Sequence, residues 1–362
     1  MSAIPAPRCP GSAIPGPPQS AEVVVVGAGV TGTAVAWQLA RRGHEVLLLE
    51  RFGPGHDRTV GRDGTAYTVR QTHADPRLGR LAVEAYAGWR ELERETGAEL
   101  LTVTGGLDHG DPDTTAALAA GLTAQGVVHE WLEPTQAQRR WPGQEFVGRV
   151  LHQPDRAGRV RTEHAAAAFG AAAVGWGAVV LHPTAVEALE VRGPAAVDVR
   201  TTGGTVRARR VVVTAGPASA SLVADRLAVP TPHAVPERAV RFTRRTAIPA
   251  GPVAVHHTAN GPLSVAPLSD GRVEVGTAGP ESLPSTGRLI DYAQRYLPGL
   301  DPGTAQTVER RATAASDTGF AAAAGPVAVG VGLSGRGLAF APAAGRVLAD
   351  LVTGTGDRVG AA

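Results

Sequence analysis

Lysine is absent from the sequence, and all 35 basic residues are arginine. This absence excludes a Schiff-base lysine, a pyridoxal-phosphate lysine and the lysine of a phosphate-binding P-loop. Cysteine is almost as scarce, because Cys9 is the single one in the chain. An internal disulfide, a four-cysteine zinc site and an iron–sulfur cluster are therefore excluded as well. We interpret this cysteine usage as that of a protein of the reducing cytoplasm.

An excess of charge and long apolar runs are also lacking. The 35 basic and 33 acidic residues leave a formal net charge of +2, and no dense basic stripe predicts a nucleic-acid partner. The uncharged runs at 23–40, 165–181 and 318–335 are each interrupted by glycine, so we expect no membrane span. Residues 1–20 are rich in Pro, Ala, Gly and Ser and do not resemble a signal peptide, which predicts a disordered leader.

The sequence does contain one well-marked β–α–β unit. The continuous apolar run EVVVV (22–26) is typical of a strand that is buried on both faces. A glycine turn follows, then a helical segment over 30–42 that Gly43 ends, and then a second apolar strand, EVLLLE (45–50). With 362 residues, 43% of them hydrophobic, the chain is long enough for about two domains around buried cores.

The turn of this unit, Gly27-Ala28-Gly29-Val30-Thr31-Gly32, has the spacing of a dinucleotide-binding fingerprint. Gly27 permits the tight turn, Gly29 lets the backbone approach a pyrophosphate, and Gly32 lets the helix and strand pack closely. Glu50 ends the next strand, where an acid accepts hydrogen bonds from the ribose hydroxyls of the cofactor. The alternative is a glycine turn that binds nothing.

The fingerprint alone does not separate NAD from FAD. Its place within the first 50 residues favours FAD, as does a second glycine-rich segment at 332–337. Backbone amides there, with the positive end of the following helix, would face the flavin pyrimidine ring, which gains negative charge on reduction. An ordinary strand–loop–helix connection is the alternative for this second segment.

Further segments complete a predicted α/β fold. Helices are expected at 77–97, 113–124, 162–174 and 285–297, and antiparallel strands over 233–278 with turns at 259–261 and 269–271. Strands are also expected within 179–216, with a turn at 202–204. A last buried strand is predicted at 326–332, and Pro342 is expected to open a C-terminal helix.

Together these segments resemble the D-amino acid oxidase superfamily of FAD-dependent oxidoreductases, most closely its monomeric sarcosine oxidase and glycine oxidase branch. The similarity is most specific in VVVVGAGVTGTAVAWQLARRGHEVLLLER (23–51) and GLSGRGLAFAPAAGRVLADLVTG (332–354). TAYTVRQTHADPRLGRLAVEAY (65–86) is similar to the family's arginine-bearing strand and the helix after it. RARRVVVTAGPAS (207–219) is similar to a middle segment of its FAD domain.

The resemblance implies an α/β fold with a discontinuous Rossmann-like FAD-binding domain, formed by 21–95, 150–218 and 322–362. Residues 96–149 and 219–321 would form a substrate domain with a mostly antiparallel sheet. It implies oxidation of an amine, amino acid or related nitrogen-containing metabolite by hydride transfer to FAD, in a monomer or small homo-oligomer. The residues expected to contact FAD are Gly27, Gly29, Val30, Thr31, Gly32, Glu50, Arg51, Gly216, Gly335, Arg336, Gly337 and Leu338.

The departures from the family pattern lie where its chemistry is expected. The family's flavin-linking cysteine would fall near Ala314, so non-covalent FAD is expected, and its oxygen-activating lysine would fall at Glu274. A substrate-binding histidine becomes Ala278, a lysine becomes Ala339, and one of two early arginines becomes Tyr67. The cofactor half of the pattern is kept and the substrate half is rewritten, which favours a specialised biosynthetic tailoring step over general catabolism.

Four residues are candidates for catalysis. Arg70 keeps the position of the second early arginine, and a substrate carboxylate favours a bidentate arginine. Glu274, on an alternating strand, would pair with a cationic amine or act as a base if it points inward. Tyr67 would donate a hydrogen bond to substrate, and Arg336 would stabilise reduced flavin or bind substrate. The alternatives are a structural ion pair for Arg70, an outward-facing acid for Glu274, packing for Tyr67 and a surface charge for Arg336.

His256 and His257 are adjacent, so on a strand they face opposite sides and at most one lines a shared pocket. No other group of His, Asp or Glu has metal-ligand spacing, and we expect no metal site. Two further hypotheses remain open. The alternatives to the implied amine or amino acid oxidation are a flavin dehydrogenase that passes electrons to an acceptor other than oxygen, and a flavin-binding protein without redox turnover.

Overall fold

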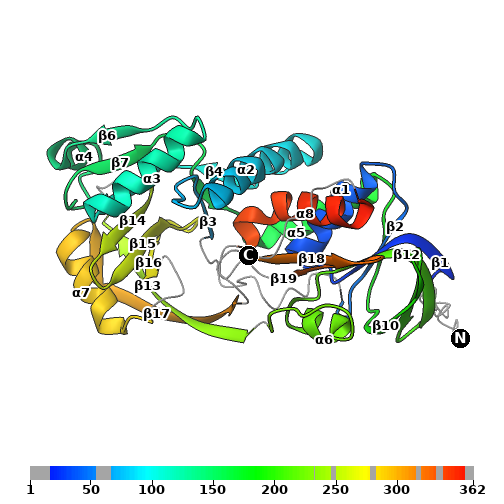
Figure 1. The fold of residues 1–362 in the computed structure, drawn as a ribbon. Helices are drawn as coiled ribbons and strands as arrows, with labels where there is room; N and C mark the ends of the chain where they lie inside the picture. Colours follow the sequence, from blue (N-terminus) through cyan, green and yellow to red (C-terminus); the bar gives the residue numbers. More distant parts are fainter. Residues whose placement is uncertain are drawn as a thin grey trace, which may run out of the picture.

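The computed structural model describes residues 17–53, 67–231, 233–245, 250–277, 283–314, 319–331 and 337–354. Two large sheets dominate this part of the chain and lie towards opposite ends of an elongated molecule (Figure 1). Between them lie the long helix α2 (Pro76–Thr96) and a small sheet of β3 (Tyr67–Val69), β8 (Gly158–Val160) and β4 (Leu101–Val103). None of the described helices is long and apolar enough to cross a bilayer.

The first large sheet has a parallel centre, in which β9, β2, β1, β12 and β19 lie side by side. The strands of this sheet are β1 (Ser20–Val26), β2 (Val46–Leu49), β9 (Val179–Leu181), β10 (Val186–Gly193), β11 (Ala196–Thr201), β12 (Gly204–Val213), β18 (Phe320–Ala324) and β19 (Val327–Val331). Val23 and Val25 point into one apolar cluster, and Val24 and Val26 into another. Strand β1 is therefore buried on both faces, as its continuous apolar run predicts.

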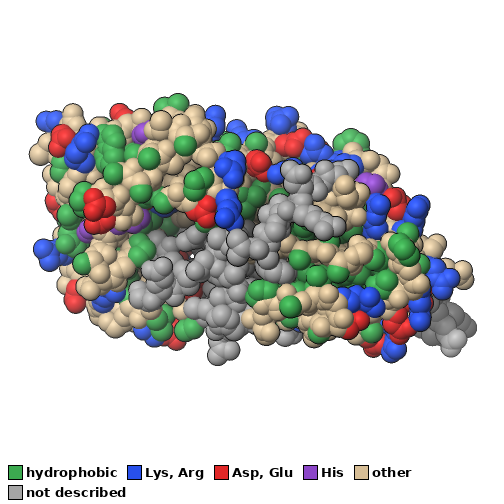
Figure 2. All heavy atoms as spheres, in the orientation of Figure 1, with side chains coloured by type: hydrophobic (Ala, Val, Ile, Leu, Met, Phe, Trp, Pro, Cys, Tyr) green, Lys and Arg blue, Asp and Glu red, His purple; other side chains and the backbone are tan. Residues whose placement is uncertain are grey.

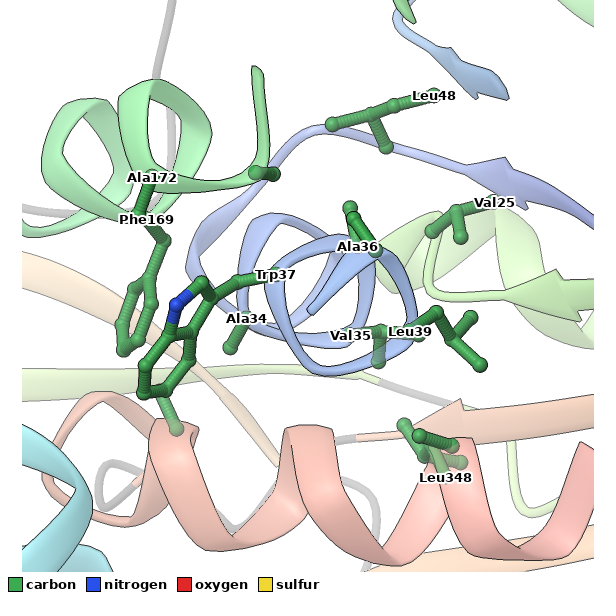
Figure 3. Close-up of a cluster of buried hydrophobic side chains, with 14 of the residues drawn as sticks. Val25, Ala34, Val35, Ala36, Trp37, Leu39, Leu48, Phe169, Ala172 and Leu348 are labelled. Atoms are coloured by element: carbon green, nitrogen blue, oxygen red, sulfur yellow. The ribbon is translucent and has the colours of Figure 1, made fainter. Parts of the chain in front are cut away.

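Four helices contribute to the cluster on one face: α1 (Val30–Ala40), α5 (Thr162–Gly175), α8 (Gly337–Thr353) and α2. Trp37 of α1 lies beside Phe169 of α5, with ring centroids 5.5 Å apart, and Leu348 of α8 lies on the same side of α1 as Leu39 (Figure 3). Helix α8 approaches α1 closely at Gly345, where a Cβ atom would lie 2.8 Å from the backbone of Ala34. The glycine therefore sets the distance between the two helices.

The prediction that Pro342 opens the C-terminal helix is wrong, because Pro342 lies inside α8. A proline inside a helix removes one backbone hydrogen bond, and here packing against α2 stabilises the affected turn. The indole Nε1 of Trp89 donates a hydrogen bond to the Ala339 carbonyl at 3.0 Å. Gly88 makes room for the proline ring, because a Cβ atom there would lie 2.5 Å from Cβ of Pro342.

The second large sheet runs in the order β17–β13–β16–β15–β14–β5–β7–β6, and its neighbours are antiparallel except for β14 and β5. The bounds are β5 (Gly106–Gly110), β6 (Glu130–Leu132), β7 (Val150–Gln153), β13 (His233–Arg244), β14 (Val253–Thr258), β15 (Gly261–Pro267), β16 (Val273–Thr277) and β17 (Leu300–Ala314). The predicted α/β fold class, with one Rossmann-like sheet and one mostly antiparallel sheet, is confirmed. The proposed domain boundaries remain a prediction.

The helices predicted at 77–97, 113–124, 162–174 and 285–297 are α2, α3 (Pro112–Ala124), α5 and α7 (Thr286–Tyr296). Two short helices were not predicted, α4 (Pro134–Arg140) and α6 (Ser219–Val223), and neither is long enough to show a clear apolar period. A 3-10 turn, η1 (Gly216–Ala218), precedes α6.

The two faces of the second sheet differ in character. One face, here the outer face, is apolar and packs on α7; Val240, Phe242 and Val275 of the sheet share a buried cluster with Leu289. Because side chains alternate along a strand, Arg241 and Glu274 point to the opposite face, here the inner face. Asp108 and His257 belong to the inner face too, since their strand neighbours Leu107 and His256 contact the outer side.

A group of buried rings lies on the outer face. His109 and His256 stack with ring centroids 4.3 Å apart, and His256 also meets Tyr296 edge-on at 5.0 Å. The Val147 amide donates a hydrogen bond to Nδ1 of His109 at 3.2 Å. Burial lowers the pKa of His109 to about 3, and that of His256 to about 4, with nearby imidazoles acting in the same direction. Both rings are therefore neutral in the folded protein near neutral pH.

This ring stack predicts a loss of stability in mild acid. The unfolded histidines take up protons below their ordinary pKa of 6.5, whereas the folded ones do so only near pH 3 to 4. The free energy of unfolding should therefore fall as the pH decreases from 6.5 towards 4, by up to about 1.4 kcal/mol per pH unit for each histidine. Denaturant unfolding at pH 7, 6 and 5 measures this slope.

Replacing His256 by Phe keeps a flat ring and should remove about half of the slope. His44→Gln is the matched control, because His44 is a partly exposed histidine that contacts Glu22 at 2.9 Å. A slope that is the same in the wild type and in His256→Phe would contradict this explanation.

Candidate functional site

The glycine turn after β1 has the geometry that its fingerprint predicts. Gly27 has a φ of 97°, and a Cβ atom there would lie 2.7 Å from the Thr214 carbonyl oxygen. At Gly32 a Cβ atom would lie 1.8 Å from the Gly27 carbonyl oxygen, so only glycine fits. Thr214, which directly follows β12, donates its hydroxyl hydrogen bond to the carbonyls of Val26 and Gly27 at 3.0 and 3.2 Å. The turn is thereby held between two strands and a helix.

The N-terminus of α1 can accept an anion. Its N-cap, Gly29, provides no side-chain cap, and the first helical turn, which includes Val30 and Thr31, contains no acidic residue. A Cβ atom on Gly29 would meet nothing within 4 Å, so open space lies beside the free amides of this turn. Free amides and the positive end of the helix dipole suit a pyrophosphate.

Glu50 lies beside the same turn and is only partly buried. Its carboxylate accepts hydrogen bonds from the Ala28 amide at 2.8 Å and from the Phe52 amide at 3.0 Å. This fixes an acid next to the free amides of α1, where a ribose would follow a pyrophosphate. The residues present therefore fit the dinucleotide part of FAD: the glycine turn and α1 would hold the pyrophosphate, and Glu50 would hold the ribose.

The other residues predicted to contact the cofactor lie in different settings. Arg51 is exposed and its guanidinium lies over the Phe52 ring, 4.5 Å from the centroid. Gly216 has a φ of 58° and open space beside it. Gly337 begins α8, and the Leu338 side chain is buried in the apolar cluster of that helix. Gly335 and Arg336 lie outside the described residues, and so does Ala278. Their roles remain predictions.

Arg70 forms the centre of a second polar site, immediately after β3. Its Nη1 lies 3.1 Å from Oδ1 of Asp108, and Nε2 of His257 lies 2.8 Å from the same oxygen. The Asp108 side chain is 1% exposed, those of Arg70 and His257 16% and 14%. Burial by itself would raise the pKa of Asp108, but the Arg70 charge and the His257 hydrogen bond outweigh it and hold that pKa below its usual value. Asp108 is therefore an ionised, buried carboxylate.

Glu274 also points inward, to the inner face of the second sheet. Its Oε2 lies 3.0 Å from Nε of Arg241, its cross-strand neighbour on β13, and both residues are buried. The alternative of an outward-facing acid is therefore wrong. The ion pair compensates both buried charges, as buried charges require.

The remaining candidates are placed as follows. Tyr67 is partly buried and packs against the apolar cluster around Trp89. His256 and His257 do face opposite sides of β14, and only His257 belongs to the inner face. Ala339 lies within α8, and Cys9 and the side chain of Ala314 are not described.

Three residues of these sites, Asp108, Arg241 and Thr214, were not predicted from the sequence. In the strands GLDHG (106–110) and AVRFT (239–243), Asp108 and Arg241 each follow an apolar residue. Because side chains alternate along a strand, both polar side chains face away from the apolar side, and this was the available signal. Thr214 has no comparable signal, because its role depends on where β12 ends beside β1.

On the face shown in Figure 2, arginines alternate with acidic side chains on the described surface and do not gather in one region.

Comparisons with known proteins agree with this arrangement. Residues 22–351 match the family described as FAD dependent oxidoreductase (DAO). The chain is similar to a monomeric sarcosine oxidase of Streptomyces avermitilis, with 31% identity over 92% of this chain and 94% of that protein. It is also similar to the structure of NikD, described as an unusual amino acid oxidase essential for nikkomycin biosynthesis, with 27% identity, a TM-score of 0.76 and coverage of 92% and 94%.

The fold is shared more widely. Glycine oxidase from Geobacillus kaustophilus has a TM-score of 0.74 at 22% identity, over 94% of this chain and 96% of that one. The matched range begins in β1 and ends in α8, so it includes the glycine turn, both large sheets and the residues around Arg70. The chain therefore belongs to the DAO family of FAD-dependent oxidoreductases.

Proposed function

We propose that this oxidoreductase acts on a small amino acid or related amine that carries a carboxylate, and that Arg70 binds that carboxylate. The proposal depends on the Arg70 guanidinium, which is largely buried and is held by Asp108 through only one of its nitrogens. Within the described part of the chain, Arg70 makes a single ion pair, through Nη1 to Asp108. The other side of the planar fork remains for a second, incoming carboxylate. Relatives named for sarcosine and amino acid oxidation support this substrate class.

Each part of the site has a separate task in this proposal. FAD, when bound, supplies the acceptor for the hydride on the carbon next to the substrate nitrogen. The glycine turn, the α1 amides and Glu50 hold the cofactor. Arg70 holds the substrate carboxylate and so orients the C–H bond, which contributes by removing rotational freedom. Tyr67, three residues before Arg70, is proposed to donate a hydrogen bond to the substrate.

The FAD is expected to be bound without a covalent bond, because the chain has no cysteine other than Cys9. Acid precipitation of the purified protein should leave the yellow colour and intact FAD in the supernatant. Gly29→Val should lower the FAD content to near zero, because its branched side chain would occupy the open space at the α1 N-terminus. The ratio of FAD to protein is measured by absorbance after denaturation.

Gly193→Val is the matched control, since a Cβ atom at Gly193 also meets nothing within 4 Å but lies at the end of β10, in a margin of the sheet. It should keep its FAD. Full FAD content in Gly29→Val would exclude the turn as the pyrophosphate site. Colour retained in the precipitate would exclude non-covalent binding.

For Arg70, the informative variant is Arg70→Lys, because it keeps the positive charge beside buried Asp108 and removes only the planar fork. With a carboxylate substrate, kcat/KM should fall by about two orders of magnitude. With the matching amine that lacks the carboxylate, kcat/KM should barely change. Anaerobic bleaching of the flavin with a panel of amino acids and their decarboxylated amines measures both.

The panel also tests the other hypotheses. A protein without redox turnover would bleach with no member of the panel. A substrate whose kcat/KM is the same in the wild type and in Arg70→Lys would remove Arg70 from the site.

A second candidate function, a dehydrogenase with an acceptor other than oxygen, is favoured by the Arg241–Glu274 pair. Electron transfer to oxygen creates an anion, and a fixed positive charge near the flavin lowers its barrier. Glu274 stands where the family is expected to have its oxygen-activating lysine, and here it is paired with Arg241 at 3.0 Å. The pair carries no net charge. We therefore expect slow reoxidation by oxygen.

Glu274→Gln should remove the carboxylate that lies 3.0 Å from Arg241, which makes the net charge there more positive, and speed reoxidation by about tenfold. Stopped-flow mixing of photoreduced enzyme with oxygenated buffer gives the rate. The double variant Arg241→Gln/Glu274→Gln should return to the slow rate, which separates a charge effect from a loosened sheet. A fast wild-type rate that Glu274→Gln does not alter would contradict the prediction.

A further inference from the structure

Asp108 and His257 come from neighbouring strands of the second sheet and reach the same face. Strands β5 and β14 run parallel, with Asp108 opposite Val255 and Gly110 opposite His257. His257 is therefore two residues beyond the partner of Asp108, which is the spacing for one shared face. Arg70 approaches them from the small sheet. The Arg70–Asp108–His257 cluster thus joins three strands that are distant in sequence.

Both partners act on one oxygen of Asp108. Because an ionised carboxylate only accepts hydrogen bonds, Nε2 of His257 carries a hydrogen and donates a hydrogen bond to Oδ1 at 2.8 Å. Nη1 of Arg70 donates to the same Oδ1 at 3.1 Å. The position of the guanidinium is therefore set by where Oδ1 lies, and His257 fixes Oδ1.

We propose that Asp108 and His257 are positioning residues, which fix the orientation of the Arg70 fork towards the substrate carboxylate. This inference rests on the proposed role of Arg70. Arg70 and ionised Asp108 together carry no net charge, so a substrate carboxylate gains little from charge alone. Its binding in the productive orientation depends on the direction of the remaining guanidinium N–H groups.

The proposal predicts a split between binding and turnover. Asp108→Asn keeps the side-chain shape but removes the negative charge that opposes an anion. Short carboxylates should therefore bind as tightly as in the wild type or more tightly. The rate of flavin bleaching at saturating substrate should fall at least about tenfold, because the neutral amide oxygen of Asn holds the guanidinium more weakly than the carboxylate does. A merely structural role of Asp108 would weaken FAD retention and carboxylate binding together.

His257 provides the second, independent pair of variants. His257→Leu removes the donor to Asp108 and should also slow bleaching by about tenfold. His257→Gln can place an amide N–H near the position of Nε2 and should restore most of the wild-type rate. This pair decides the question even if Asp108→Asn folds poorly, because it changes only a donor at the edge of the cluster.

The experiment uses the FAD-loaded full chain. Acetate and propionate are titrated while the flavin absorbance spectrum is recorded, and bleaching is followed anaerobically with an amino acid that reduces the wild type. Asp198→Asn is the matched control; Asp198 also accepts hydrogen bonds from two arginines, Arg192 and Arg207, but lies on β11 of the first sheet. It should behave as the wild type.

The outcomes separate the two proposals. Carboxylate binding that is unchanged in Arg70→Lys removes the anchor itself. If Arg70→Lys loses carboxylate binding while Asp108→Asn and His257→Leu bleach at the wild-type rate, Arg70 remains the anchor and the positioning role is overturned. Slow bleaching in His257→Leu that His257→Gln does not restore also overturns it.

Discussion

The contact between the Gly27 carbonyl and Gly32 determines where the cofactor half of the molecule is assembled. A Cβ atom on Gly32 would lie 1.8 Å from that oxygen, so α1 can begin directly against the turn only with glycine there. Thr214 ties the same turn to the end of β12. Helix α1 then lies on the parallel sheet, α5 and α8 pack on α1, and its free amides point to the open space beside Gly29. The candidate anion site is thus a result of packing in the core and not of a separate loop.

The second sheet keeps charged side chains buried on one of its two faces. Its outer face is apolar, whereas its inner face carries Arg241–Glu274 and the Asp108 carboxylate with its two partners. Moving one charged side chain from water into the protein interior costs roughly several kcal/mol of free energy unless a partner compensates the charge. Glu274 lies 3.0 Å from Arg241 and Asp108 lies 3.1 Å from Arg70, and this pairing allows both carboxylates to be buried on the inner face.

Sequence patterns predicted the structural features that depend only on residues close together in the chain. The turn at 27–32, Glu50 at the end of the next strand and the opposite orientations of His256 and His257 all follow from local periodicity. The ion pairs and hydrogen bonds between residues of distant strands could not be predicted in this way. Arg241 is 33 residues from Glu274, and His257 is 149 residues from Asp108, so each pairing depends on strand register and sheet order. The prediction that Pro342 begins the last helix was wrong for the same reason. Helix α2, which packs against that turn, lies far away in the sequence.

The Arg70 ion pair connects the two halves of the molecule. Arg70 directly follows β3, which contacts α8, and α8 packs closely on α1 where Gly345 meets Ala34. Through Asp108, the same side chain is bound to β5 in the second sheet. The guanidinium is therefore located relative to the first sheet by backbone packing and relative to the second sheet by one buried carboxylate. Because a buried ion pair loses much of its energy when one partner moves, a displacement of the second sheet would directly change the direction of the Arg70 fork. With Arg70 in its proposed role as the carboxylate anchor, substrate orientation depends on how the two sheets are held together.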